Sequence, residues 1–188
     1  MESLLYIVIA LTAIRIAIFA LLHIQYPKFN PFKNTVSDYG TGDSRRLYSL
    51  IGSLSLLAYT GLFAYLLFSN YSPVWLIYIL GIAVAGSIAI LVFPTDLTGK
   101  KMTRTGRIHW LLAILNFSML FVFMTNATIP DVASQPVALE IMTNIVRVAF
   151  YTFLASLVLP KLRAKYIGIT ERAFLTYILR ESQTTTDA

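Results

Sequence analysis

Residues 74–93 read VWLIYILGIAVAGSIAILVF, a stretch of twenty residues without a charged side chain. About 20 mostly apolar residues in an α-helix are enough to cross the hydrocarbon core of a bilayer. The stretch does not alternate between apolar and polar residues, and it is about twice as long as a strand of a membrane β-barrel. It therefore predicts a membrane-spanning α-helix.

Four further runs of the same kind flank this stretch. The composition agrees with a membrane protein, because 57% of the 188 residues are hydrophobic and only 13% are charged, whereas soluble domains carry roughly 25% charged residues. The chain has no cysteine, which excludes disulfides, thiolate metal ligands and cysteine nucleophiles. We predict an all-α membrane bundle with five spans: Leu4–Ile24, Tyr48–Phe68, Val74–Phe93, Trp110–Ile129 and Val137–Leu159.

The C-terminal part of the chain is less apolar. Residues 1–166 are expected to form the five-span membrane domain. Phe174, Leu175, Ile178 and Leu179 would form one apolar stripe on a helix over residues 167–181, which is too short to span and is expected to lie along the membrane surface. Residues 182–188 are predicted to be a disordered tail.

Basic residues predict the orientation. Three segments between and after the spans carry thirteen of the fifteen Lys and Arg residues, and the segments on the other side carry none: Lys28, Lys33, Arg45, Arg46, Lys100, Lys101, Arg104, Arg107, Lys161, Arg163, Lys165, Arg172 and Arg180. The positive-inside rule then predicts a multi-pass protein of the cell membrane with its N-terminus outside and its C-terminus in the cytoplasm. This distribution accounts for the net charge of +6 without nucleic acid. The expected partners are membrane lipids, with a homo-oligomer left open.

Several polar residues gather at the predicted cytoplasmic face. They include both histidines of the chain, His23 and His109, together with Ser37, Asp38 and Asp96. The two His and two Asp side chains are candidate ligands for a divalent metal, and Asp38, Asp96 and His109 are equally candidates for an acid/base pair. Ser37 joins Asp38, Asp96 and His109 as a candidate ligand-binding residue. The structural alternative is that the Asp residues cap helices and turns.

Two arginines lie inside predicted spans, Arg15 in the first and Arg147 in the fifth. An arginine at the centre of a membrane helix costs at least ~2.5 kcal/mol, so each is expected to face the bundle interior or water. Glu140 is the only acid inside a span. Together with Asn144, Arg147 and Tyr151, which follow it at helical spacing, it forms one polar stripe on the fifth span. The surplus positive charge makes Arg15 and Arg147 candidate ligands for a lipid phosphate or another anion. The alternative is a buried arginine held by backbone carbonyls and neighbouring polar side chains.

Three motifs resemble those of a known family. They are Asn34-Thr35-Val36-Ser37-Asp38-Tyr39-Gly40; Phe93-Pro94-Thr95-Asp96 followed by Gly106 and His109; and Gly168-Ile169-Thr170-Glu171-Arg172. Together they are similar to the signatures of domain of unknown function family 998. The resemblance implies a small polytopic prokaryotic membrane protein, commonly with six spans, and it brings no established activity, substrate or cofactor. The present chain departs from that pattern where the sixth span would be.

These observations favour a non-transporting membrane protein with a polar pocket at the cytoplasmic face, which would bind a lipid head group, an anion or a metal. One alternative is a membrane-embedded hydrolase that acts on a lipid ester or phosphate. Another is a transporter or channel subunit, which is motivated by Arg15 and Arg147. The sequence leaves open whether the protein is an enzyme.

Overall fold

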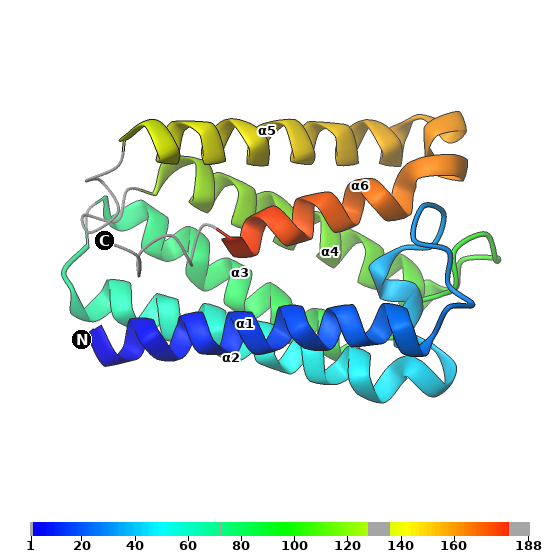
Figure 1. Ribbon diagram of the computed structural model, residues 1–188, viewed down its shortest axis with the longest axis horizontal. Helices are drawn as coiled ribbons and strands as arrows, with labels where there is room; N and C mark the ends of the chain where they lie inside the picture. The colour runs from blue at the N-terminus through cyan, green and yellow to red at the C-terminus, as the bar shows by residue number, and fades with distance from the viewer. Residues whose placement is uncertain (1, 72, 128–135, 181–188) are drawn as a thin grey trace.

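The computed structural model describes residues 2–71, 73–127 and 136–180, and within these ranges it is all-α, as predicted (Figure 1). Two short 3-10 helices, η1 and η2, lie in the loop between the first two α-helices. The elements are α1 (Glu2–Gln25), η1 (Val36–Gly40), η2 (Gly42–Ser44), α2 (Arg45–Phe68), α3 (Val74–Val92), α4 (Arg104–Asn126), α5 (Pro136–Val158) and α6 (Pro160–Arg180).

The first five α-helices are long and apolar enough to cross a membrane, which confirms the five predicted spans. The largest difference in the described boundaries is at α4, which begins at Arg104 instead of Trp110. The Thr103 side chain accepts a hydrogen bond from the backbone N–H of Gly106, so the helix is capped one turn and a half before its apolar run begins. The end of this predicted span, residues 128 and 129, lies outside the described residues.

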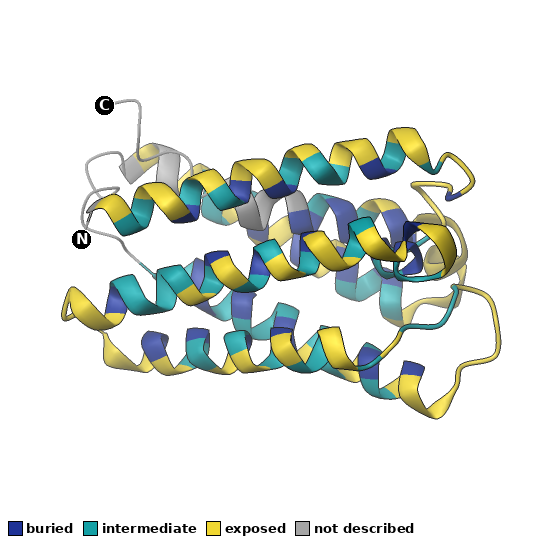
Figure 2. Ribbon diagram, turned by 90° about the horizontal axis from the view of Figure 1, so that it is seen from below, coloured by how far each residue is buried: buried dark blue, intermediate teal, exposed yellow. Residues whose placement is uncertain are grey.

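Consecutive helices pair as neighbours, α1 with α2, α3 with α4 and α5 with α6. The main core lies between α2, α3, α4, α5 and α6 and includes Leu66, Leu80, Phe123, Phe150 and Phe174. Most outward faces of the helices are exposed (Figure 2), and many of these side chains are large and apolar. This pattern is the one that a lipid-facing surface requires.

One end of the bundle carries most of the irregular structure. It holds the α1–α2 loop with η1 and η2, the α3–α4 loop and the α5–α6 turn, all at the right of Figure 1. We refer to these three segments together as the loop end. A second hydrophobic cluster, built on Leu22, Phe29, Tyr39 and Ile51, anchors the α1–α2 loop to the helices below it.

The C-terminal helix differs from the predicted surface helix over residues 167–181. It begins at Pro160, directly after α5, and it runs back along the bundle beside α5 (Figure 1). Phe174 and Leu175, two residues of the predicted apolar stripe, are buried inside the protein, whereas the stripe was expected to lie against the membrane surface. The side chains of Ile178 and Leu179 and the predicted disordered tail lie outside what the structure describes.

Candidate functional site

Asp38 joins two loops of the loop end. Its side chain is fully buried. One carboxylate oxygen accepts the backbone N–H of Thr35 at 2.9 Å and the side-chain amide of Asn34 at 3.0 Å. The other oxygen accepts the backbone N–H of Thr98 at 2.6 Å, across to the α3–α4 loop. Both oxygens of this predicted site residue are therefore used to hold η1 and the α3–α4 loop together.

Asp96 stabilises the start of α4. Its carboxylate accepts the backbone N–H of Thr103 at 2.6 Å and the Thr103 hydroxyl at 3.0 Å. An acidic side chain at this place also interacts favourably with the positive end of the helix dipole. A Cβ atom added to Gly106 would lie 2.5 Å from Cγ of Asp96, so only glycine leaves room for the carboxylate. The motif of Asp96 and Gly106 is thus explained by helix capping.

Glu171 connects α6 to the loop end. Its Oε2 atom accepts the backbone N–H of Val36 at 2.7 Å, and the side chain is buried. Glu171 lies outside the five spans, and burial raises its pKa to about 7, against the opposing effects of the Val36 hydrogen bond and the Arg172 charge. Glu171 was not among the candidate site residues predicted from the sequence. The only signal that pointed to it was the Gly-x-x-Glu-Arg motif.

Arg172 holds the α1–α2 loop from the next position on α6. Its Nη1 atom donates to the backbone carbonyls of Pro31 and Asn34 at 2.8 and 2.6 Å. Its Nε atom donates to Nε2 of His23 at 2.7 Å, and Nδ1 of His23 lies 2.8 Å from the Phe19 carbonyl. Both ring nitrogens of His23 are therefore engaged within the protein.

The predicted metal set does not assemble. In the ranges that the structure describes, no three His, Cys, Asp or Glu side chains lie together in a way that could hold a metal ion. His23, Asp38 and Asp96 are instead bound to the separate partners given above. His109, the fourth member of the set, contacts the carbonyl oxygen of Phe93 through its Nδ1 atom.

His109 is buried and extends from α4 toward the end of α3. Its Nδ1 atom lies 2.8 Å from the carbonyl oxygen of Phe93, so this nitrogen carries a proton and Nε2 is the acceptor in the neutral ring. No Asp–His hydrogen bond occurs among the described residues, and the predicted acid/base pair is not formed in this arrangement. His109 lines both of the cavities described next.

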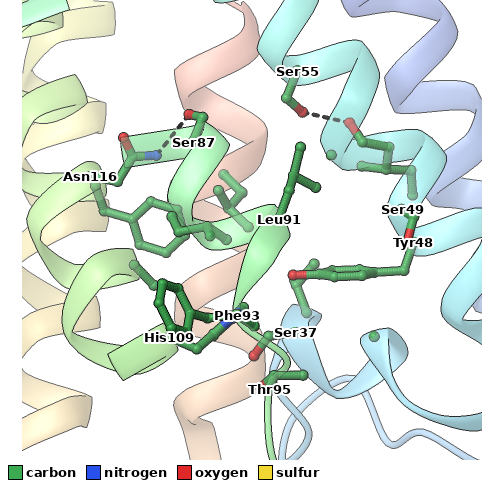
Figure 3. Close-up of a pocket in the computed structure, with 18 of the residues that line it drawn as sticks. Ser37, Tyr48, Ser49, Ser55, Ser87, Leu91, Phe93, Thr95, His109 and Asn116 are labelled. Carbon is green, nitrogen blue, oxygen red and sulfur yellow. Dashed lines mark hydrogen bonds between the residues drawn. The ribbon is translucent and has the colours of Figure 1, made fainter. Parts of the chain in front are cut away.

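A cavity of about 170 Å³ extends from the loop end into the bundle. Figure 3 shows hydroxyl, imidazole and amide groups from α2, α3, α4 and η1 around it. Its polar lining consists of Arg15, Ser37, Arg45, Tyr48, Ser49, Ser55, Tyr59, Ser87, Thr95, His109, Asn116 and Glu171. A second cavity of about 100 Å³ shares Ser37, His109 and Glu171 and reaches Asp96. We call the first of these the Arg15 cavity.

The two arginines within spans occupy opposite environments. Arg15 faces the bundle interior, with 8% of its surface exposed, and its Nη1 atom is buried without a hydrogen-bond partner among the described residues. Arg147 is exposed on the outer face of α5 and lines neither cavity. The expectation of an inward-facing arginine therefore holds for Arg15 and not for Arg147. Of the candidate residues, the Arg15 cavity brings together Arg15, Ser37 and His109.

The comparison with protein families agrees with the three motifs. The family model described as "Protein of unknown function (DUF998)" matches residues 8–179. No curated protein and no solved structure matches the chain. The matched range includes all three motifs, which meet at the loop end through Asp38, Glu171 and Arg172. The chain thus belongs to the DUF998 family, and its five long apolar helices make it a polytopic membrane protein.

Proposed function

We propose that this polytopic membrane protein binds an anionic group, a phosphate or a carboxylate, in the Arg15 cavity. The observation that carries the proposal is the Arg15 guanidinium, which lines the cavity with a buried nitrogen that has no hydrogen-bond partner in the part of the chain that the structure describes. A buried cation without a partner is costly. An anion with acceptor oxygens would satisfy it and form strong charge-assisted hydrogen bonds.

The size and the lining of the cavity support a small ligand group. Hydroxyl donors come from Ser37, Tyr48 and Ser49, and such groups commonly fix the orientation of a bound anion. A volume of about 170 Å³ accommodates a head group or a small soluble anion. The acyl chains of a lipid would remain outside the cavity and lie against the helices.

We infer that the loop end faces the cytoplasm, with the N-terminus of α1 on the outside of the cell membrane. The sequence assigned thirteen basic residues to this side. Because α6 runs away from the loop end, it removes Arg180 from this set, and twelve basic residues remain there. The positive-inside rule favours this orientation. The prediction of a cytoplasmic C-terminus assumed that the segment after the fifth span stays at the loop end. In the structure α6 runs back from the loop end along the bundle (Figure 1).

The two alternative functions gain less support. A hydrolase that uses Asp38 as a base needs a free carboxylate, and both Asp38 oxygens accept backbone N–H groups. Asp96 is engaged in the same way by Thr103. A transporter or channel subunit stays a prediction, and no specific contact among the described residues favours it.

The proposal is tested by anion binding to the purified protein in lipid nanodiscs. Inorganic phosphate and nanodiscs containing phosphatidic acid are compared by thermal unfolding and native mass spectrometry. A ligand that binds only the folded state at 100 times its Kd stabilises the protein by about 2.7 kcal/mol. We expect this stabilisation with the wild type and its loss in Arg15→Gln. Stabilisation by phosphate identifies a soluble anion, and stabilisation by phosphatidic acid alone identifies a head group.

Arg107→Gln is the matched control, because Arg107 is an exposed arginine of α4 that lines neither cavity. It should bind as the wild type does. Equal stabilisation of the wild type and Arg15→Gln by every anion would show that the Arg15 cavity is not the binding site. The absence of any anion effect on the wild type would refute the proposal outright.

A further inference from the structure

The outer face of α5 carries a polar stripe, which we define as Glu140, Asn144, Arg147 and Tyr151. These positions are separated by four, three and four residues, the spacing that keeps side chains on one side of a helix. All four are exposed. Arg147 Nη1 donates to Asn144 Oδ1 at 3.3 Å, its one hydrogen bond within the part of the chain that the structure describes.

This stripe lies on a helix that is apolar enough to span a membrane, Glu140–Val158. Arg147 is eleven residues from each end of α5, or about 16 Å at the rise of an α-helix. At that depth a charged side chain that faces lipid is strongly disfavoured. The opposite face of α5, with Val146, Ala149 and Phe150, is already buried in the bundle, and α5 lies at its edge (Figure 1). The polar stripe therefore requires a cover that residues 2–71, 73–127 and 136–180 of its own chain do not supply.

We propose that α5 of a second copy of this chain covers the polar stripe, in a parallel pair about a twofold axis along the membrane normal. In such a pair, residues with the same number face each other. Asn144 then meets Asn144 of the second copy, and an amide can both donate and accept. Interhelical hydrogen bonds of this kind hold membrane helices together.

Charge also favours a second copy. The stripe contains one acid and one base, Glu140 and Arg147, so its net charge is zero and it is a poor match for an anionic lipid. Helical side chains tilt toward the N-terminus, which directs Arg147 toward the level of Asn144 and Glu140 of the second copy. Ile141 and Val148, which are 54% and 64% exposed, supply apolar contacts beside the stripe. An antiparallel pair would place the two basic loop ends on opposite sides of the membrane, against the positive-inside rule.

The test uses cysteine cross-linking in native membranes. The chain has no cysteine of its own, so a disulfide between two copies can form only at the introduced residue. Val137 precedes Glu140 on the same face and is 68% exposed. Under mild oxidation Val137→Cys should form a band of twice the chain mass. Val74→Cys is the matched control, because Val74 opens α3 at the same end of the bundle and is 54% exposed. It should stay monomeric.

The polar stripe is then altered in the Val137→Cys background. Asn144→Leu and Arg147→Leu keep the helix apolar enough to insert, and each should reduce the cross-linked fraction at least fivefold. Neither residue lines either of the two cavities described above, so the result is independent of anion binding in the Arg15 cavity. Equal cross-linking at Val137→Cys and Val74→Cys, no effect of the leucine variants, or a covalent product with the mass of another membrane protein would each overturn the proposal.

Discussion

Replacing Asp38 with alanine tests whether this buried acid is a structural tie or a reactive group. The substitution leaves the backbone N–H groups of Thr35 and Thr98 without their acceptors. Each buried donor left unsatisfied costs about 1–3 kcal/mol. Because both donors are only partly buried, water can compensate in part, and we expect a loss near the lower half of this range, about 2–4 kcal/mol in total.

Asp38→Asn should fall between alanine and the wild type, because the amide keeps one acceptor oxygen and loses the other. The assay is thermal unfolding followed by the fluorescence of the two tryptophans in a fixed detergent. At 2–4 °C per kcal/mol for a chain of this size, the alanine variant should unfold roughly 10 °C below the wild type. Asp43→Ala is the control, because Asp43 is an exposed acid of the same loop.

The outcome that refutes this reasoning is specific. If Asp38→Ala unfolds within about 2 °C of the wild type, less than 1 kcal/mol by the same conversion, the three hydrogen bonds to Asp38 do not hold the loop end. If Asp38→Asn in addition abolishes ligand binding at unchanged stability, Asp38 acts on the ligand, as the hydrolase alternative requires.

Three further predictions concern the same end of the bundle. Gly106→Ala should displace the Asp96 carboxylate and lower stability by about 1–3 kcal/mol, measured by thermal unfolding, whereas Gly99→Ala, with open space but a positive φ, should cost about 1 kcal/mol. Arg15→Gln should unfold at or above the wild-type temperature without ligand, because it removes a buried charge whose Nη1 atom has no partner among the described residues; a large drop would show that Arg15 is satisfied within the protein. The pKa of Glu171 is raised from 4.5 to about 7 in the folded protein, so its contribution to stability is present below pH 4.5 and is lost as the pH rises through 7. The unfolding temperature should therefore fall between pH 5 and 8 in the wild type and change less in Glu171→Gln, and parallel pH profiles would contradict this.

The five spans were predictable because each is a long run of apolar residues, and length and hydropathy alone decide whether such a run can cross a bilayer. The place of α6 was not predictable in this way. Its sequence is polar for a helix inside a bundle, and it is accommodated because Glu171 and Arg172 find backbone partners in the α1–α2 loop. Those partners are more than 130 residues away in the chain, and no local pattern reveals them.

Asp38 and Asp96 were candidates for a metal or acid/base site, with the capping of helices and turns as the structural alternative. The contacts they make are those of the alternative, because both accept backbone N–H groups, which every sequence has and no motif displays. Arg15 and Arg147 could not be told apart, because each lies on a helix that is apolar on most sides and therefore has no distinct inward face. Only packing shows that one points into the bundle and the other away from it.

The ties from α6 to the first loop impose an order on the assembly of the protein during synthesis. Val36 N–H and the carbonyls of Pro31 and Asn34 are made early, but their partners, Glu171 and Arg172, are made near the end of the chain. The ribosome therefore releases four further helices before the first loop can reach its final conformation. Until then these polar backbone groups must stay in water at the membrane surface, and the first two helices form a hairpin whose loop still lacks its contacts with α6.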